Sequence, residues 1–403
     1  MWKYNFVFME LTQYYIILFV VSLCATWWIF KKVLKIAKLK NIVDNPDARK
    51  LQRVPVPVLG GVAVFFGMVT AFATAGLIWD ISSMFAMVCV MTIMLYVGTM
   101  DDILGLSPKV RFLAEILVVL LLIYCNKYSI NNFHGLWGIY EISDWIAVPL
   151  TVFACVGIIN AINMIDGVNG LSSGYCIVTS LIFGSAFIFA GDVNRASLAI
   201  LSVGALIPFF FHNVFGKKSK MFIGDGGTML MGTIMSVFVI NTLKSDSALA
   251  AATPDNFGLI PFALAVLVIP VFDTLRVMSA RIVRGKSPFN PDKTHLHHLL
   301  IDLHFSHIGT TMVEIFASLF AVACWYLSYR MGASIDVQLY IVIFIGFMIT
   351  FAFYKFARSQ ERKQSRIYHW LTKIGDKTHV GHTRWFEGLT RVLDRKSDVV
   401  NKE

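Results

Sequence analysis

The chain has 403 residues, of which 57% are hydrophobic and only 15% charged, and its formal net charge is +10. Soluble domains are closer to half apolar and a quarter charged, so this composition excludes an ordinary soluble globule. Apolar blocks long enough to cross a bilayer recur along the chain, which predicts an all-α polytopic membrane protein. Basic loops of such a protein explain the positive charge, and we expect no nucleic-acid partner. The six cysteines form no CxxC pair, so the sequence gives no sign of a zinc site.

The apolar blocks predict about eleven transmembrane helices. The first ends at Lys31 and Lys32 without a small-residue cleavage site, which favours a retained span over a removable signal peptide. We expect a transmembrane catalytic domain at residues 1–357, including a cytoplasmic loop at 281–310. The predicted spans are 12–30, 59–79, 82–100, 110–126, 144–162, 171–190, 196–214, 226–243, 259–280, 311–330 and 336–357.

The distribution of Lys and Arg predicts the orientation of these spans. If the N-terminus lies outside, thirty of the thirty-five basic residues fall in inside segments and five in outside segments. Cytoplasmic loops carry such an excess of positive charge. We therefore expect the N-terminus outside and the C-terminus in the cytoplasm.

Two segments outside the spans have a recognisable pattern. Residues 130–143 contain spaced apolar residues and two glycines, and are expected to form a small hairpin on the outer side. The basic cytoplasmic tail, residues 358–403, contains a stretch at 384–396 with its apolar residues on one helical stripe. Such a helix can lie in the headgroup plane or pack against the protein's own loops, and the sequence favours neither.

Two adjacent carboxylates, Asp101 and Asp102, end the third predicted span in GTMDDILGLSPKVRF. Neighbouring carboxylates repel unless a cation or a shared proton separates them, and Mg²⁺ prefers such hard oxygen ligands. Lys109 follows at the start of the next span. A solvated polar loop would give the same short pattern, so the pair alone does not establish a metal site.

Asn160, Asn163 and Asp166 recur every third residue at the end of the fifth span, in IINAINMIDGVNGLSSG. This spacing places polar groups along one side of a helix. Polar residues near membrane depth usually have a function or a partner. The glycines that follow are compatible both with close helix packing and with an anion at the start of the sixth span.

Asp225 lies between glycines at the start of the eighth span, in KKSKMFIGDGGTMLMG. A carboxylate on such a tight turn can reach a metal ion. The alternative is a helix N-cap, a position that Asp favours.

Basic residues and histidines crowd the loop after the ninth span, in PVFDTLRVMSARIVRGKSPFNPDKTHLHHLL. Arg281 and Arg284 belong to a basic strip. His295, His297 and His298 form an HxHH cluster whose spacing is poor for zinc but whose rings can donate hydrogen bonds to phosphate. A solvated loop remains the alternative. Together, the four motifs predict a Mg²⁺-bound diphosphate at one face of the bilayer, where a water-soluble nucleotide can meet a lipid.

In this order and on this topology, the four motifs resemble those of the polyprenyl-phosphate N-acetylhexosamine-1-phosphate transferase superfamily. The likeness runs from about Asn45 to Ile308. The segment RGKSPFNPDKTHLHHLL looks like the bacterial undecaprenyl-phosphate N-acetylglucosamine-1-phosphate transferase branch, and the context of the triple histidine in the peptidoglycan branch is missing. The resemblance implies an enzyme of the bacterial plasma (inner) membrane, with its active site on the cytoplasmic face, that is commonly a homodimer.

The resemblance also implies roles for individual residues. Asp101, Asp102 and Asp166 match catalytic positions, and Asp225 matches the ligand of Mg²⁺, for which Mn²⁺ is a possible substitute. The tail after Arg358 has no role in this comparison. The other matches are substrate-binding positions: Lys109, Asn160, Asn163, Arg281, Arg284, His295, His297 and His298.

We therefore expect transfer of N-acetylglucosamine (GlcNAc) 1-phosphate from UDP-GlcNAc to undecaprenyl phosphate, with release of UMP. The product, GlcNAc-diphospho-undecaprenol, would begin the membrane steps of a cell-surface polysaccharide such as the lipopolysaccharide O-antigen. Another UDP-N-acetylhexosamine is the alternative donor. A membrane transporter is the alternative of a different class, but a transporter would place polar groups near the midplane between related halves. Here they lie at one face, and no repeat is evident.

Overall fold

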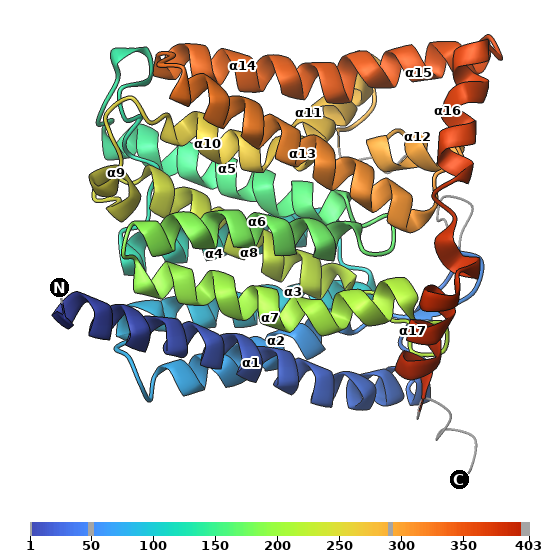
Figure 1. The fold of residues 1–403 in the computed structure, drawn as a ribbon, viewed down its shortest axis with the longest axis horizontal. Coiled ribbons are helices and arrows are strands. Elements are labelled where there is room, and N and C mark those ends of the chain that lie inside the picture. Colours follow the sequence, from blue (N-terminus) through green and yellow to red (C-terminus); the bar gives the residue numbers. More distant parts are fainter. Residues whose placement is uncertain (1, 47–51, 289–292, 396–403) are drawn as a thin grey trace.

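The computed structural model describes residues 2–46, 52–288 and 293–395. Most of its helices run side by side along one direction, and α16 and α17 cross their ends (Figure 1). Within the described residues, eight helices are long and apolar enough to cross a membrane, or nine if a bent pair counts as one. The chain is therefore a polytopic helical membrane protein.

The long helices correspond to the spans predicted from the sequence. Two predicted spans, α2 and α4, do not meet the same test, because α2 has 16 residues and α4 carries three charged ones. The main helices are α1 (Trp2–Leu39), α2 (Gly60–Ala75), α3 (Phe85–Leu104), α4 (Pro108–Asn126), α5 (Asp144–Met164), α6 (Leu171–Phe189), α7 (Val193–Phe215), α8 (Gly224–Leu243), the bent pair α10 (Leu259–Val266) and α11 (Val268–Val283), α13 (His307–Arg330), and α14 (Ile335–Phe347) continued by the π-helical turn η3 (Met348–Ala352) into α15 (Phe353–Arg362).

Short elements connect these helices at the two ends of the bundle. The two strands pair antiparallel, with Val43 opposite Pro57 and Asp44 opposite Val56. The short elements are β1 (Val43–Asp44), β2 (Val56–Pro57), η1 (Ser82–Met84), η2 (Leu136–Gly138), α9 (Ala248–Ala252), α12 (Leu296–Asp302), α16 (Arg366–Asp376), η4 (Val380–His382) and α17 (Arg384–Asp394).

Helix α8 lies at the centre of the bundle, with every residue of its apolar window buried. It packs against α3 and α5, and also against α2 and α6. Small residues permit these contacts: a Cβ atom at Gly232 would lie only 2.7 Å from the Cα atom of Ile159 on α5. Close backbone approach at small residues is typical of helix packing in membranes.

The ninth predicted span, 259–280, is not one straight helix, because α10 and α11 meet at an angle of 76°. Pro270 has no N–H group to donate to the carbonyl of Val266, four residues earlier. That carbonyl instead accepts hydrogen bonds from the Tyr175 hydroxyl (2.8 Å) and the Ser318 hydroxyl (3.3 Å). Helices α6 and α13 therefore satisfy the backbone group that the break leaves free.

The tail crosses one end of the bundle as α16 and α17 (Figure 1). The amphipathic helix predicted at 384–396 is present as α17, and the last predicted position, Lys396, lies outside the described residues. The Thr390 hydroxyl donates to the Phe215 carbonyl (2.8 Å), and the Asp394 carboxylate accepts from the Ser219 amide (2.9 Å). One face of α17 thus packs against the protein's own α7 end.

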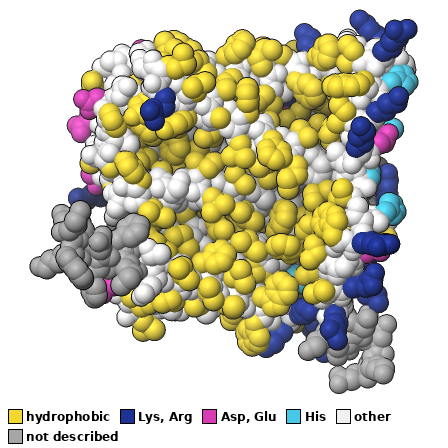
Figure 2. Space-filling model, in the orientation of Figure 1, with side chains coloured by type: hydrophobic (Ala, Val, Ile, Leu, Met, Phe, Trp, Pro, Cys, Tyr) yellow, Lys and Arg dark blue, Asp and Glu magenta, His cyan; other side chains and the backbone are white. Residues whose placement is uncertain are grey.

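Charge separates the two ends of the bundle. Figure 2 shows a broad hydrophobic surface over the middle, with Lys, Arg and His gathered at the end where α16 and α17 lie. We call this the basic end. The predicted hairpin is at the opposite end, where Phe133 N–H donates to the Tyr140 carbonyl (2.9 Å) and Asn132 pairs with Glu141.

Candidate active site

The site begins at a close contact between α3 and α8. A Cβ atom at Gly98 would lie 2.5 Å from the backbone of Asp225, and one at Gly226 would lie 2.6 Å from the Thr99 hydroxyl oxygen. These two glycines therefore let the last turn of α3 reach the first turn of α8. This contact brings the acidic pair together with Asp225, although more than 120 residues separate them in the chain.

We expect Gly98→Val to disrupt this junction, because its side chain would collide with backbone that cannot move aside. Overpacking of this kind costs about 1–3 kcal/mol, and the activity should fall at least tenfold as the site is displaced. Thermal unfolding in detergent and turnover would be measured together. Gly157→Ala on α5 is the matched control, because nothing lies within 4 Å of its added Cβ atom. Equal behaviour of the two variants would contradict the packing argument.

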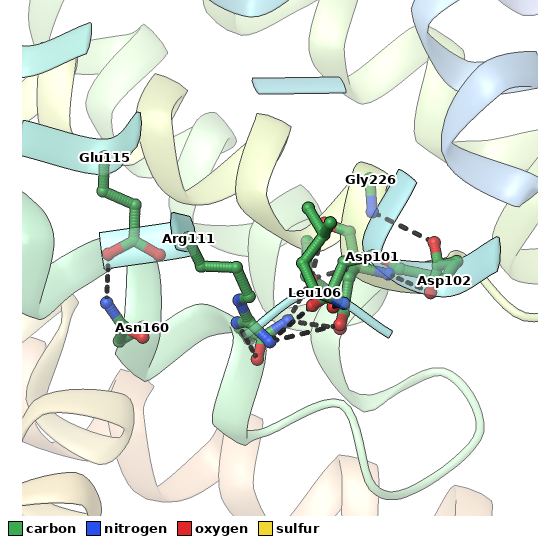
Figure 3. A network of polar contacts seen from close by, with 11 residues as sticks. Asp101, Asp102, Leu106, Arg111, Glu115, Asn160 and Gly226 are labelled. Carbon is green, nitrogen blue, oxygen red and sulfur yellow. Dashed lines mark hydrogen bonds and ion pairs between the residues drawn. The ribbon is translucent and has the colours of Figure 1, made fainter. Parts of the chain in front are cut away.

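Asp102 caps α8 from outside that helix. Its two carboxylate oxygens accept hydrogen bonds from the backbone N–H groups of Asp225 (2.9 Å) and Gly226 (3.2 Å) (Figure 3). The N-terminus of a helix leaves such N–H groups unpaired and favours negative charge. The capping alternative considered for Asp225 is therefore wrong: Asp102 provides the cap, and the Asp225 side chain is left for other partners.

Arg111, on the first turns of α4, joins the polar groups of three other helices. Its Nη1 atom donates to Asp101 (2.8 Å) and lies 3.3 Å from Asp225, and its Nη2 atom donates to Asn163 (3.2 Å). Asn163 in turn donates from Nδ2 to Asp225 (2.7 Å) and to the hydroxyl of Thr228 (2.8 Å). The motifs of the third, fifth and eighth predicted spans thus meet around one guanidinium group (Figure 3).

A cavity of about 760 Å³ opens beside this cluster. This is within the usual range for small-molecule sites, about 300–1,000 Å³. Eight predicted site residues line it: Lys109, Asn160, Asn163, Asp166, Arg281, His295, His297 and His298.

The other four predicted residues lie outside this wall. Asp101 and Asp225 adjoin the cavity through Arg111 and Asn163, which do line it, and Asp102 is bonded to the backbone N–H of Asp225. Arg284 lies at the exposed C-terminus of α11 and does not line the cavity. The structure therefore separates it from the neighbouring basic position, Arg281, which is buried and donates to the carbonyl of Pro288 (2.5 Å).

Asp166 and His297, on the cavity wall outside the membrane spans, have shifted pKa values. Desolvation of the carboxyl by surrounding protein raises the pKa of Asp166 to about 7, although part of the residue is open to solvent, and a hydrogen bond from Ser172 partly opposes this. Burial holds the pKa of His297 well below its ordinary range. His297 is therefore neutral near pH 7, and its buried Nδ1 atom has no hydrogen-bond partner within the described residues.

Two residues of the site, Arg111 and Glu115, were not predicted from the sequence. Glu115 is buried on α4, lines the cavity and accepts a hydrogen bond from Asn160 Nδ2 (2.5 Å) (Figure 3). A signal for it was present, since an ionisable residue inside an apolar span usually has a function or a partner. In the sequence, Arg111 is one basic residue among the thirty of the inside segments, with no pattern of its own.

The acidic cluster fits a hard divalent cation. The Arg111 guanidinium already lies between the carboxylates of Asp101 and Asp225, so the place between them favours positive charge. The Asp225 side chain is 34% exposed and that of Asp101 is 8% exposed, so Asp225 is the more accessible ligand. Within the described residues, no three His, Cys, Asp or Glu side chains form a metal-binding group. Mg²⁺ often binds through only one or two carboxylates, with water and substrate phosphates completing its coordination.

These features define a class of protein: a membrane enzyme whose cavity, lined by cationic and hydrogen-bonding groups, accepts an anionic substrate beside clustered carboxylates. Residues 84–243 match the model of glycosyl transferase family 4. The chain is 30% identical over 337 residues to the "Probable undecaprenyl-phosphate N-acetylglucosaminyl 1-phosphate transferase" of Bacillus subtilis (strain 168), covering 83% of this chain and 90% of that relative.

A second relative supports the same grouping. The "Undecaprenyl-phosphate alpha-N-acetylglucosaminyl 1-phosphate transferase" of Escherichia coli (strain K12) is 28% identical over 292 residues, which is 71% of this chain and 77% of the relative. The protein of the same name from Yersinia pestis is 28% identical over 293 residues. The chain therefore belongs to glycosyl transferase family 4 and is a phosphoglycosyltransferase.

Proposed function

We propose that this enzyme transfers GlcNAc 1-phosphate from UDP-GlcNAc to undecaprenyl phosphate, releasing UMP and forming GlcNAc-diphospho-undecaprenol. The observation that carries the proposal is the cavity at the basic end, where cationic residues face an acidic cluster. The names of the relatives state the same transferred group and acceptor. Exposed apolar side chains on the same wall, Phe112 and Leu113, suit a lipid acceptor.

The cavity wall supplies the contacts that a nucleotide diphosphate needs. Lys109 and Arg281 provide positive charge, and charge-assisted hydrogen bonds to phosphate are stronger than neutral ones. His295, His297 and His298 can direct ring N–H groups at phosphate oxygens. Asn160 and Asn163, held by their contacts to Glu115 and Asp225, are ready to hydrogen-bond the nucleotide.

The reaction exchanges one diphosphate bond for another. An oxygen of the lipid phosphate attacks the β-phosphorus of UDP-GlcNAc, and the bond from that phosphorus to the bridging oxygen breaks. UMP leaves with the electron pair of that bond. A phosphate monoester has a second pKa near 6, so the acceptor is largely ionised at pH 7 and needs little help from a base. Positioning and charge neutralisation should therefore dominate the catalysis, as in other phosphoryl transfers.

The carboxylates divide these tasks. Asp102 acts as a positioning residue, because both of its oxygens already accept backbone N–H groups of α8. Asp225 would hold Mg²⁺, with Mn²⁺ as a substitute, together with the neighbouring Asp101. When bound, the metal ion would supply positive charge for the diphosphate oxygens. Asp166 lines the cavity, where its raised pKa permits it to exchange a proton near neutral pH.

Purified enzyme in detergent, given UDP-GlcNAc, undecaprenyl phosphate and Mg²⁺, tests this function. We expect UMP and a lipid-linked sugar to form in equal amounts. Chromatography of the nucleotides would measure the UMP that is released. UDP-GlcNAc should be used at least tenfold better than the galacto epimer. Release of UDP, or movement of intact UDP-GlcNAc across proteoliposomes without UMP, would instead indicate a sugar-only transferase or a transporter.

The proposed function requires the basic end to face the cytoplasm. We infer eleven spans, because each range predicted from the sequence coincides with a helix or with the bent pair. A membrane-impermeant thiol reagent tests the orientation in inner-membrane vesicles. A cysteine at Lys373 on α16 should be labelled only in inverted vesicles, and one at Asp246 only in right-side-out vesicles. The reverse pattern would place the site outside.

Two further parts of the proposal concern assembly and pathway. We propose a homodimer, which native mass spectrometry in detergent would detect as twice the 45.2 kDa chain. We also propose that the lipid product begins a bacterial cell-surface polysaccharide such as the O-antigen. Loss of that polysaccharide after deletion of the gene, and its return with the intact gene, would support this assignment.

A further inference from the structure

A buried ion pair lies behind the histidines of the cavity wall. Asp273 and Arg276, one turn apart on α11, are only 1% and 6% exposed. Arg276 Nη2 donates to Asp273 Oδ1 at 2.6 Å. Isolated buried ion pairs seldom add stability over apolar residues of similar volume, because desolvating both charges is costly. A pair in this place therefore suggests a use other than stability.

The contacts of the pair converge on His295. The Asp273 carboxylate accepts from His295 Nδ1 (2.8 Å) and from the Leu296 amide (3.1 and 3.2 Å to its two oxygens). Arg276 Nη2 also donates to the Thr294 carbonyl (2.5 Å). The pair thus holds the ring of His295 and the backbone on both sides of it.

These contacts determine which ring nitrogen of His295 carries a proton and which one faces the cavity. A carboxylate ion-paired to arginine can only accept hydrogen bonds, so His295 Nδ1 must carry a proton. Nε2 is then the nitrogen left for the cavity, which His295 lines.

The orientation of His295 affects the rest of the wall. Its ring lies nearly parallel to that of His297, with ring centroids 5.5 Å apart and an angle of 6° between the planes. The ring centroids of His297 and His298 are 4.4 Å apart. On the other side, a Cβ atom at Gly167 would lie 2.2 Å from His297 Nε2. The histidine cluster is therefore packed tightly between the α11 pair and the turn that follows Asp166.

Two groups from other helices complete the surroundings of the pair. The guanidinium of Arg276 lies 3.8 Å from the centre of the Tyr354 ring on α15, a cation–π contact. Glu314 on α13 is 1% exposed and interacts electrostatically with both members of the pair. Three elements thus hold Asp273 and Arg276 in place by direct contacts: α11, α12 and α15.

We propose that Asp273, held by Arg276, is a positioning residue for the transfer reaction: it fixes His295 with Nδ1 protonated and Nε2 presented to the diphosphate of the nucleotide substrate. This inference rests on the proposed function for the identity of that substrate. Residues that orient a functional histidine through its second nitrogen typically contribute 10–100-fold to binding or activity.

A double-mutant cycle on UMP release tests the proposal. Asp273→Asn should lower kcat/KM for UDP-GlcNAc about 10–100-fold, and His295→Ala should lower it at least as much. If Asp273 acts through His295, the double variant should be no worse than His295→Ala alone. The KM for undecaprenyl phosphate should stay within about twofold of wild type. A general folding defect would not impair the use of UDP-GlcNAc while leaving the KM for the lipid unchanged.

Asp192→Asn is the matched control. Asp192 forms an ion pair with Arg195, three residues later (3.4 Å between Oδ1 and Nη1), just as Asp273 does with Arg276, but neither residue lines the cavity. It should keep wild-type kinetics. Losses that multiply in the Asp273 and His295 double variant, or an Asp273→Asn variant with wild-type kinetics, would overturn the proposal. If Asp273→Asn does not fold, Arg276→Lys serves in the cycle, because it keeps the Asp273–His295 contact within reach but loses the bridge to Thr294.

Stabilisation by UDP, measured as the rise in thermal unfolding temperature, separates this proposal from the proposed function. Wild type should be stabilised by UDP, and the Asp273→Asn variant should lose most of that rise while Asp192→Asn keeps it. A wild-type enzyme that responds to UDP but releases no UMP would contradict the proposed function alone. A full UDP response in Asp273→Asn would overturn the positioning role alone.

Discussion

Asp225→Asn is expected to lower kcat by about 100- to 1,000-fold, the usual cost of removing a group that stabilises developing charge in a transition state. The variant keeps the size of the side chain and its place beside Asn163, whose Nδ2 atom lies 2.7 Å from Asp225 Oδ1. It removes the accessible negative charge of the acidic cluster. Turnover would be measured across a Mg²⁺ titration after chelation of bound metal with EDTA.

The control for this variant is Asp246→Asn at the opposite end of the bundle. The Asp246 side chain is 79% exposed and pairs only at the surface with Lys244, so its loss should leave kcat within about twofold of wild type, as for most surface pairs. Chelation should abolish wild-type activity, and added Mg²⁺ should restore it. Wild-type rates for Asp225→Asn at every Mg²⁺ concentration would refute the metal assignment.

Arg111→Gln is expected to show the second-largest effect, a loss of activity of at least about 100-fold together with a changed response to Mg²⁺. Arg111 contacts Asp101, Asp225 and Asn163 at once. Without its charge, the Asp101 and Asp225 carboxylates repel each other, and the loss of these partly buried bonds should cost about 1–3 kcal/mol of stability. A divalent cation can replace the missing charge, so Mg²⁺ should raise the unfolding temperature of this variant more than that of wild type.

Arg111→Lys separates charge from geometry in this prediction. Lysine keeps the positive charge, but its compact ammonium group lacks the planar fork that reaches three partners. We expect it to restore most of the stability and little of the activity. An Arg111→Gln variant with wild-type activity, or one that Mg²⁺ stabilises no more than wild type, would show that Arg111 is not the cation that balances this cluster.

The sequence predicted the helices well because membrane spans follow from local composition. Each predicted range from 12–30 to 336–357 coincides with a helix or, at 259–280, with the bent pair, and most starts and ends agree within a few residues. The main error is the break between α10 and α11. Pro270 signalled it, but the break is tolerated because Tyr175 and Ser318 satisfy the freed carbonyl of Val266, and those partners lie 91 and 52 residues away.

The candidate site was predictable where a motif carries its own signal. The Asn160, Asn163 and Asp166 series and the histidine cluster line the cavity as their patterns suggested. Arg284 did not follow Arg281 to the cavity, because only Arg281 lies on the buried side of α11.

Contacts between distant segments account for what sequence analysis missed. Arg111 bonds to residues 10, 52 and 114 positions away, and Asp102 caps a helix that begins over 120 positions later. No local pattern distinguishes Arg111 from an ordinary loop charge, and none shows that Asp102, although predicted as a site residue, caps α8. The close approach of α3 and α8 at Gly98 and Gly226 brings Asp102 to the start of α8.

The most direct test of the account uses UDP-GlcNAc labelled with ³²P at the β-phosphate. A phosphosugar transferase breaks the bond between the two phosphates, so the label should move into the lipid fraction and the released nucleotide should be unlabelled UMP. In Asp225→Asn this movement of label should fall by the same factor as UMP release. Label that remains on a released nucleotide as UDP would contradict the central claim, because the enzyme would then be transferring sugar alone.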